Sequence, residues 1–561
     1  MSLSDDTMAG RREGDTSTLV DQEKIPDKTG QEGTFKTGIG IALTCIGCMV
    51  GTGNIWRFPR ILANNGGQQG CLQFLMVWVL FLFIWSIPML VIEYAMGRYT
   101  KRSTIVSFQR MIGDNNMWGG AWIAMVTLGI SAYYSVIIGW CLYYLFYFMV
   151  NVLPTTSEES FSIFDDFVED SWMPVLCHFV TILLGAVSVA WGVKSIELAN
   201  CIVVPLFLLL LLFTFIWSMT LEYAGRGLKF MFSPDWEQFR EPRMWVDAIT
   251  QNAFDTGAGS GLFVSYAAFM TAKNGIVRSA SLVPLCNNVI SLVCGMLTFA
   301  TVFATEVKNG SSTEQIVELL KENGPGNTGL TFVWMPILYN QINGGRVLMV
   351  FFFFALLLAG FSSLVAQLEL FVHNVKDFGV SRKKASGFVV LLVFLLGLGS
   401  ALSLDFLANQ DFVWGFALLL SGMALQYLVI RFGARRFRQE LTNNFSESDW
   451  PLPLIWEWIV KFIAPLEAVA LIVWWIVTTI QESEPWYSFA TESFMITIVQ
   501  WIGFFALILV LNLLYVKFIR RYFPIPKDDS GLLLPSADNE VKGIDGTYKT
   551  FHEETTLSDE G

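Results

Sequence analysis

The fold of this chain is decided by the stretch Gly47-Cys48-Met49-Val50-Gly51-Thr52-Gly53-Asn54-Ile55-Trp56-Arg57-Phe58-Pro59. It lies within an apolar segment from about residue 38 to 62, which is long enough to cross a bilayer. Each glycine weakens a helix by about 1 kcal/mol relative to alanine. Irregular backbone within a membrane is tolerated only where protein or a water-filled cavity satisfies its N–H and C=O groups. The stretch therefore predicts a broken helix whose backbone binds a small ion and a companion solute.

The composition is that of an integral membrane protein. Of the 561 residues, 53% are hydrophobic and 15% are charged, whereas soluble proteins have about 25% charged residues. Apolar segments of about 20 residues predict twelve membrane helices. These segments lie near residues 38–62, 71–97, 117–150, 172–191, 196–219, 244–271, 279–306, 345–375, 385–404, 411–431, 455–480 and 491–518.

Loop charges predict the orientation in the membrane. Lys and Arg residues follow spans 2, 6, 8, 10 and 12, whereas the opposite loops 151–171, 405–410 and 481–490 contain neither. Positively charged loops stay in the cytoplasm, which places both termini there. We expect no cleavable signal peptide, because residues 1–34 are polar. The prediction is a multi-pass protein of the cell membrane.

A second interruption lies in span 6, five helices after the first. It reads Gln251-Asn252-Ala253-Phe254-Asp255-Thr256-Gly257-Ala258-Gly259-Ser260-Gly261. One such segment alone favours close helix packing through small residues. Two broken segments at matching positions of two five-helix halves indicate an inverted-repeat secondary transporter.

The predicted fold is therefore an all-α membrane protein with two inverted five-helix repeats. Spans 1–5 form one repeat at about residues 35–220, and spans 6–10 form the second at about 244–433. Spans 11 and 12 follow at about 455–520. The transporter domain, residues 35–520, lies between a cytoplasmic N-tail of residues 1–34 and a cytoplasmic C-tail of residues 521–561.

Four motifs carry a resemblance to a known family. They are the breaks in spans 1 and 6, Glu93-Tyr94-Ala95-Met96-Gly97-Arg98 in span 2, and Ala359-Gly360-Phe361-Ser362-Ser363 in span 8. Their order and spacing over about residues 35–520 resemble the neurotransmitter:sodium symporter family. The resemblance implies a leucine-transporter-like fold and sodium-coupled transport of an amino acid or amine by alternating access.

The resemblance also implies two sodium sites built largely from neutral oxygens, which suit a hard cation. One site comprises Gly47, Val50, Ala359, Ser362 and Ser363, and the other comprises Met49, Asn54, Asp255 and Asn287. Asp255 departs from the family pattern, which has Ser or Thr at this position. A carboxylate in a membrane core costs at least ~2.5 kcal/mol and must be paired with a cation or protonated. We expect it to act at or beside the sodium site rather than as a purely structural group.

The same region matches the anion site of chloride-dependent relatives. Gln251, Asn287 and Ser291 match its ligands, whereas Phe74 replaces a tyrosine and Asp255 replaces a serine. A fixed carboxylate repels an anion strongly at close range in a low dielectric. We therefore expect transport to be independent of chloride, with Asp255 supplying the negative charge.

The resemblance further implies a substrate site. Gly51 stands where monoamine carriers have an aspartate, which favours a substrate with its own carboxylate, and Tyr134 matches the tyrosine that binds that carboxylate. Ser260 and Gln367 stand where carriers of hydrophobic substrates have apolar residues, which predicts polar substrate groups or bound water. The predicted substrate residues are Met49, Gly51, Gly53, Ile130, Tyr134, Phe254, Gly257, Ser260, Ser363 and Gln367.

Charged residues mark two candidate gates. Arg57 and Asp411 are expected to form an external ion pair, because an arginine within a membrane span points toward a cavity or a partner. Asp377 fits the internal gate of the family. The N-terminal arginine that usually pairs with it aligns with Glu32, so its partner stays open, with Lys36 as a candidate.

Three functions stay open at this stage. The leading one is sodium-coupled uptake of an amino acid or a related small zwitterion. Asp255 also allows a cationic amine without a carboxylate. Asp255, Phe74 and Glu32 also allow a non-transporting relative that acts as a receptor or scaffold. We expect no enzyme activity and no nucleic-acid partner, because the sequence has no nucleophile–base pair, metal cluster or phosphate loop and no nucleic-acid footprint. The expected partners are a small-molecule substrate and the lipid bilayer.

Overall fold

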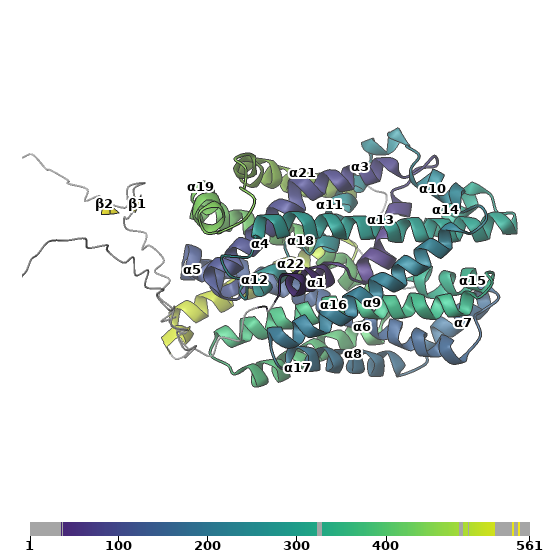
Figure 1. Ribbon diagram of the computed structural model, residues 1–561, viewed down its shortest axis with the longest axis horizontal. Helices are drawn as coiled ribbons and strands as arrows, with labels where there is room; N and C mark the ends of the chain where they lie inside the picture. Colours follow the sequence, from purple (N-terminus) through teal and green to yellow (C-terminus); the bar gives the residue numbers. More distant parts are fainter. Residues whose placement is uncertain are drawn as a thin grey trace, which may run out of the picture.

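A computed structural model describes residue 35 and residues 37–321, 328–481, 486–491, 493–521, 525, 541–542 and 548–549. Nearly all of these residues are helical, and Figure 1 shows the longest helices lying along the long axis of the molecule. The predicted N-tail, residues 1–34, and most of the predicted C-tail lie outside the described residues.

Short 3-10 and π-helical turns are labelled η. The first half comprises α1 (Gly38–Met49), η1 (Gly53–Arg57), α2 (Phe58–Asn64), α3 (Leu72–Phe81), η2 (Leu82–Ser86), α4 (Ile87–Thr100), α5 (Thr104–Ile112), η3 (Asp114–Asn116), α6 (Met117–Val150), α7 (Ser157–Val168), α8 (Met173–Val189) and α9 (Val193–Met219). Next come α10 (Ala224–Met231), η4 (Trp236–Arg240), α11 (Pro242–Thr256), α12 (Leu262–Ala267), α13 (Ile276–Asn309), α14 (Thr313–Lys321), η6 (Leu330–Trp334), α15 (Met335–Asn340), α16 (Gly345–Asp377), α17 (Arg382–Leu402) and α18 (Leu404–Phe432). The last part comprises α19 (Ala434–Arg436), η7 (Phe437–Asn443), α20 (Ile455–Trp458), η8 (Ile459–Ile463), α21 (Ala464–Gln481), α22 (Phe494–Lys517), η9 (Ile519–Arg521) and the antiparallel pair β1 (Val541–Lys542) and β2 (Tyr548–Lys549).

The predicted all-α membrane fold with broken spans 1 and 6 is confirmed. Within the described residues, nine helices are long and apolar enough to cross a membrane, and two bent pairs raise this number to eleven. The sixth predicted span is divided into α11 and α12, each too short to cross a bilayer alone. One predicted loop, 405–410, is wrong: it forms the start of α18, because the Ser403 side chain caps that helix by accepting the Phe406 N–H.

Span 1 breaks after α1. Val50 leaves the helical conformation, with φ −76° and ψ 101°, and α1 meets the η1–α2 segment at 48°. The Gly51 N–H donates to Asn54 Oδ1 over 2.8 Å, and the Thr52 N–H donates to the Tyr134 hydroxyl over 2.9 Å. Side chains therefore satisfy N–H groups that the helix has released, as a break within a membrane requires.

Span 6 breaks at its glycines. Gly257, Gly259 and Gly261 have φ values of +67°, +91° and +75°, the left-handed region that glycine adopts without a steric penalty. The fully buried carboxylate of Glu93 in α4 accepts the Gly259 N–H over 2.8 Å and the Phe263 N–H over 3.2 Å. A side chain from span 2 thus replaces helical acceptors that are missing between α11 and α12.

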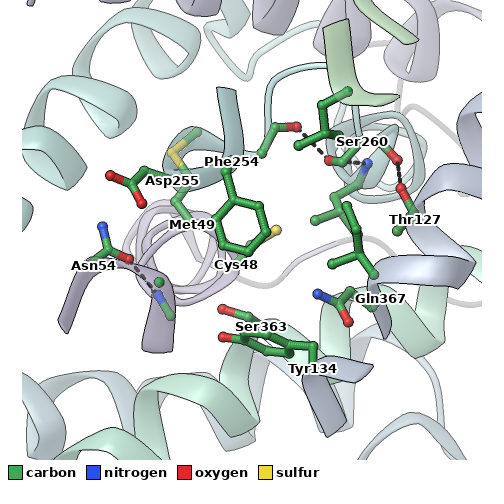
Figure 2. A pocket seen from close by; sticks show the side chains of 16 residues that line it. Cys48, Met49, Asn54, Thr127, Tyr134, Phe254, Asp255, Ser260, Ser363 and Gln367 are labelled. Carbon is green, nitrogen blue, oxygen red and sulfur yellow. Dashed lines mark hydrogen bonds between the residues drawn. The ribbon is translucent and has the colours of Figure 1, made fainter. Parts of the chain in front are cut away.

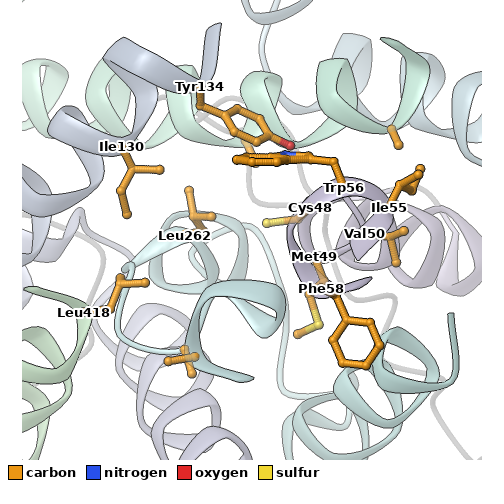
Figure 3. Packing of buried hydrophobic residues seen from close by; sticks show 14 of the residues in the cluster. Cys48, Met49, Val50, Ile55, Trp56, Phe58, Ile130, Tyr134, Leu262 and Leu418 are labelled. Carbon is orange, nitrogen blue, oxygen red and sulfur yellow. The ribbon is translucent and has the colours of Figure 1, made fainter. Parts of the chain in front are cut away.

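Apolar side chains from four helices pack around the first break (Figure 3). Met49 of α1, Ile130 of α6, Leu262 of α12 and Leu418 of α18 are buried there. The long helix α6 packs against α8, α16 and α18, so it forms a central support of the bundle. The break therefore lies in the protein core and not against lipid.

The two ends of the bundle carry different elements. Figure 1 shows α7, α10, α14 and α15 at one end, and α5 and α19 at the other. Arg102 precedes α5 and Arg436 lies in α19, so basic loops that we predict to be cytoplasmic share one end. This arrangement agrees with the alternation of loop charges along the chain. The assignment of that end to the cytoplasm stays a prediction.

Candidate functional site

A small cavity of about 50 Å³ lies where the two breaks meet (Figure 2). It is lined by Cys48, Met49, Gly51, Gly53, Asn54, Thr127, Ile130, Tyr134, Phe254, Asp255, Gly257, Ser260, Leu262, Ser363, Gln367 and Leu418. The lining contains all ten predicted substrate residues. Sequence reasoning missed Cys48, Thr127, Leu262 and Leu418, which reach the cavity through helix packing and carry no signal in the sequence that marks a binding residue.

Gly51 lets the backbone approach the Tyr134 side chain closely. A Cβ atom added at Gly51 would lie 2.3 Å from the Tyr134 hydroxyl and 2.7 Å from Ser363 Oγ, which is closer than real Cβ atoms come. The Tyr134 hydroxyl accepts the Thr52 N–H, and its own hydrogen stays available for a ligand. This wall of the cavity is thus a donor-bearing surface that requires glycine at position 51.

Asp255 belongs to a hydrogen-bond network that starts at Arg57. Arg57 Nη1 donates to Gln251 Oε1 over 2.5 Å, and Gln251 Nε2 donates to Asp255 Oδ1 over 2.7 Å. Ser291 donates to Asp255 Oδ2 over 3.3 Å and accepts from Asn54 Nδ2 over 2.7 Å. Among the described residues no Lys or Arg forms an ion pair with Asp255. The carboxylate is therefore connected to the Arg57 guanidinium through an amide.

The predicted residues of the first sodium site are neighbours in this network. Met49, Asn54 and Asp255 line the cavity, and Asn54 Nδ2 donates to Asn287 Oδ1 over 2.9 Å. The predicted anion ligands Gln251, Asn287 and Ser291 lie in the same network. One group of residues therefore unites the predicted sodium and anion sites, and its carboxylate is fully enclosed by protein.

Phe74, which replaces the tyrosine of chloride-dependent relatives, is fully buried in α3. This helix packs against α11, which carries Gln251 and Asp255. A phenylalanine offers no hydrogen-bond donor to an anion at this position. The loss of the anion site stays a prediction.

The predicted residues of the second sodium site also lie together. The Ser362 hydroxyl donates to the Gly47 carbonyl over 2.7 Å and to the Ala359 carbonyl over 2.8 Å. The Ser363 hydroxyl donates to the Gly47 carbonyl over 3.3 Å. Val50 is the first residue after α1. The oxygens that meet here are uncharged, and this donor set fits a small monovalent cation.

The predicted external ion pair is formed and has further partners. Arg57 Nε lies 3.7 Å from Asp411 Oδ1, and the Arg57 guanidinium carbon lies 4.7 Å above the centre of the Phe254 ring. Arg60 Nη2 lies 3.5 Å from Asp411 Oδ2, and the Tyr133 hydroxyl donates to Asp411 Oδ1 over 3.0 Å. Arg60 and Tyr133 were missed, although an arginine three residues after Arg57 in a membrane span is itself a signal of a partner.

At the opposite end, Asp377 binds a basic residue that the sequence analysis did not select. Arg102 Nη1 lies 3.1 Å from Asp377 Oδ1, and the Ser103 N–H donates to Asp377 Oδ2 over 2.7 Å. Both belong to the loop between α4 and α5. The candidate partner Lys36 lies outside the described residues, as does Glu32, which stands at the position of the family's usual arginine.

Aromatic contacts also close this end of the molecule. Phe35 contacts the rings of Tyr266 and Phe269 edge-on, with centroids 6.3 Å and 6.5 Å away. The Lys101 ammonium donates to the Met270 carbonyl. The first half of the chain is thus joined to the segment that follows α12 by both polar and apolar contacts.

The chain is similar to known transporters over most of its length. Residues 32–169 and 161–521 match the model of the sodium:neurotransmitter symporter family. An uncharacterized sodium-dependent transporter of Methanocaldococcus jannaschii is 28% identical over 455 residues, which are 78% of this chain and 89% of that protein. The sodium-dependent nutrient amino acid transporter 1 of Drosophila persimilis is 24% identical over 527 residues, which are 82% of this chain and 77% of that protein. The crystal structure of MhsT in complex with L-phenylalanine is similar with a TM-score of 0.68 and 28% identity, and the match covers 79% of this chain and 99% of MhsT.

Proposed function

Because this chain belongs to the sodium:neurotransmitter symporter family and is a sodium-dependent transporter, we propose that it takes up an amino acid or a related small zwitterion by symport with sodium. MhsT was crystallised with L-phenylalanine, and the Drosophila persimilis relative is named a nutrient amino acid transporter. Both support an amino acid as the substrate class here.

The observation that carries this proposal is the pair of half-helix ends at the cavity. The η1–α2 segment begins at Gly53, so its N–H end faces the cavity, and α11 ends at Thr256, so its C=O end faces it. Helix N-termini attract anions and C-termini attract cations. A zwitterion presents a carboxylate to the first end and an ammonium group to the second.

The wall at Gly51 supports the placement of the carboxylate. The Tyr134 hydroxyl has a hydrogen to donate, and the missing side chain at Gly51 leaves the hydroxyl accessible. A carboxylate accepts such bonds strongly because it is charged. An aspartate at position 51 would collide with the same hydroxyl, so we infer that the carboxylate comes from the substrate.

We propose that two sodium ions are carried with this substrate. The first is held by Met49, Asn54, Asp255 and Asn287, and the second by Gly47, Val50, Ala359, Ser362 and Ser363. The hydrogen bonds that join these residues support the proposal, because they bring most of the required oxygens together. The carboxylate of Asp255 supports transport without chloride, since it already supplies a negative charge beside the first site.

Alternating access requires that each end can open in turn. Contacts at both ends support this proposal: Arg57 and Arg60 reach Asp411 at one end, and Arg102 reaches Asp377 at the other. The side chains of these ion pairs are only 5–15% exposed, so each set holds its end closed, and opening must bring water to the separated charges. The external set caps the substrate cavity through the Phe254 ring.

A second candidate is a carrier of cationic amines, and Asp255 is the observation that favours it. Its carboxylate lines the cavity and has no ion-pair partner among the described residues. It would bind an ammonium group in the absence of a substrate carboxylate. Comparing each amino acid with its decarboxylated amine separates the two candidates.

The test is a thermal-stability screen of the purified protein with amino acids and the matching amines, in sodium and in choline. A true substrate at 100 times its Kd adds about 2.7 kcal/mol to the free energy of unfolding. We expect an amino acid to stabilise the protein in sodium and to have little effect in choline. Stronger stabilisation by the amine would favour the second candidate. If no compound shows a sodium-dependent effect, the chain is a receptor or scaffold and not a symporter.

A further inference from the structure

The side chain of Gln367 in α16 lines the substrate cavity with unused hydrogen-bonding capacity. The residue is 6% exposed, and its Oε1 atom is enclosed without a hydrogen-bond partner. Within the described part of the chain its Nε2 atom has no partner either. Buried amides are almost always paired, so an unpaired one at a binding cavity points to a partner that comes from the ligand.

The other polar side chains near Gln367 already have partners. The Ser260 hydroxyl donates to the Gly257 carbonyl, and the Thr127 hydroxyl donates to the Ser260 carbonyl over 2.7 Å. The Ser363 hydroxyl donates to the Gly47 carbonyl over 3.3 Å. In this wall the Gln367 amide therefore keeps both its donor and its acceptor capacity for a substrate.

The position of this amide assigns it to the substrate's side chain. Figure 2 shows Asp255 and Asn54 on one side of the Phe254 ring, and Gln367 and Thr127 on the other. Asp255 and Asn54 of the proposed first sodium site thus lie across the Phe254 ring from Gln367, whereas Ser363 of the second site lies on the Gln367 side. The carboxylate and ammonium groups of a zwitterion would occupy the region between the half-helix ends, so its side chain would reach Gln367.

The remaining walls limit the size and charge of that side chain. Ile130, Leu262 and Leu418 are apolar and help to enclose a small cavity. No Lys, Arg or His is found among its lining residues, so an anionic side chain would lack a counter-charge. The carboxylate of the lining, Asp255, lies on the far side.

We propose that Gln367 selects amino acids with a short, uncharged, hydrogen-bonding side chain, carrying a hydroxyl or a carboxamide. This inference rests on the proposed function, since it assumes an amino acid substrate. A primary amide both donates and accepts, and so do a hydroxyl and a carboxamide. An apolar side chain of equal shape would leave the Gln367 amide buried and unpaired, and sites of this kind reject such analogues strongly.

Two pairs of nearly isosteric amino acids test the inference. The Kd values of threonine and valine, and of asparagine and leucine, are measured in sodium and in choline with the full-length protein. We expect threonine and asparagine to bind in sodium about tenfold or more tightly than their apolar counterparts. Gln367→Leu removes the amide at similar volume and should bring both Kd ratios to about one or below.

A matched control is available in α18. Gln426 is also a buried glutamine, and its Oε1 atom is also unpaired, but it does not line the cavity. Gln426→Leu should leave both Kd ratios as in the wild type. A loss of selectivity in this variant would mean that general loosening of the fold explains the result.

The two ways of failing are distinguishable. Sodium-dependent binding of amino acids with Kd ratios near one, or with valine and leucine preferred, would overturn the inference and leave the proposed function standing. Unchanged ratios in Gln367→Leu would overturn it as well. Absence of sodium-dependent binding by every amino acid would contradict the proposed function and the inference together. If the Gln367→Leu protein does not fold, the Kd ratios of the wild-type protein still test whether the site prefers hydrogen-bonding side chains.

Discussion

Asp255 is the residue on which the proposed ion requirement of this transporter depends. Its two oxygens accept from Gln251 and Ser291, and the Arg57 guanidinium lies one amide away. In chloride-dependent relatives the resemblance places a serine here and a tyrosine at Phe74. We propose that the ionised carboxylate takes the place of a bound anion in this network, because either one supplies one negative charge next to the proposed sodium ligands.

Replacing Asp255 with serine should therefore create a need for chloride. In wild-type proteoliposomes we expect equal sodium-driven uptake in chloride and in gluconate. Asp255→Ser should lose about 90% or more of its uptake in gluconate, since one missing charge changes a buried site by at least 1.4 kcal/mol, which is tenfold. Chloride should restore part of this loss. Asp255→Glu serves as the control and should remain insensitive to chloride. Strong chloride dependence of the wild type would refute the role assigned to Asp255.

At the scale of elements, the two broken helices are maintained by groups outside them. Span 1 is stabilised by Tyr134 from α6, and span 6 by Glu93 from α4. The glycines permit the unusual backbone conformation, but the side chains from neighbouring helices satisfy its released N–H groups. A break is therefore a property of three or four helices together and not of one sequence segment.

Truncating Glu93 should destabilise the break in span 6. Glu93→Ala leaves the Gly259 and Phe263 N–H groups without their acceptor, and each buried unsatisfied group costs about 1–3 kcal/mol. We expect the melting temperature to fall by several degrees and substrate binding to weaken with it. Glu93→Gln keeps one oxygen acceptor, so its melting temperature should lie between those of the wild type and Glu93→Ala. Identical melting curves for wild type and Glu93→Ala would show that the carboxylate does not support the break.

The sequence predicted the spans well because a membrane helix is encoded locally, in its length and apolar composition. The third predicted span, residues 117–150, matches the bounds of α6, and the glycine clusters located both breaks. The start of α18 was predicted seven residues late, because a polar stretch with a good cap is helical without being apolar.

The parts of the site that were missed depend on contacts between distant segments. Thr127 and Leu418 line the cavity only because α6 and α18 pack against each other. Arg102 contacts Asp377 although the two residues are 275 positions apart in the chain, and nothing in the composition of either segment identifies this pair. The predicted substrate residues line one cavity, and they could be grouped in advance because the resemblance supplied an arrangement in space that the sequence alone does not express.

At the scale of the whole molecule, the proposed gates are the ion-pair contacts at its two ends. Arg57 and Arg60 converge on Asp411 above the cavity, whereas Arg102 connects the α4–α5 loop to the end of α16. The second contact joins the first half of the chain to the second half. Loss of this contact should favour the conformation that opens toward the end carrying α5 and α19.

Cys48 provides a native reporter for this opening, because it lines the central cavity. The labelling reagent is a membrane-impermeant thiol reagent, added to inside-out vesicles so that it meets the cytoplasmic side. We expect Cys48 to be labelled about tenfold faster in Arg102→Ala than in the wild type. The matched control is Arg436→Ala. Arg436 is partly exposed, and it pairs with Glu440, four residues further along the chain, rather than with Asp377. Cys48→Ser in the Arg102→Ala background should abolish the added label. Equal labelling rates in wild type and Arg102→Ala would exclude the contact as a gate.

The tight fit of Gly51 against Tyr134 also restricts how this transporter can evolve. A Cβ at position 51 would come within 2.3 Å of the tyrosine hydroxyl, so a mutation to aspartate is blocked until the tyrosine has shrunk or moved. A smaller residue at 134 alone would discard the donor that serves a substrate carboxylate. If the proposed amino acid transport is correct, a change to monoamine transport through an aspartate at position 51 would therefore require the Tyr134 side chain to change or move at the same time.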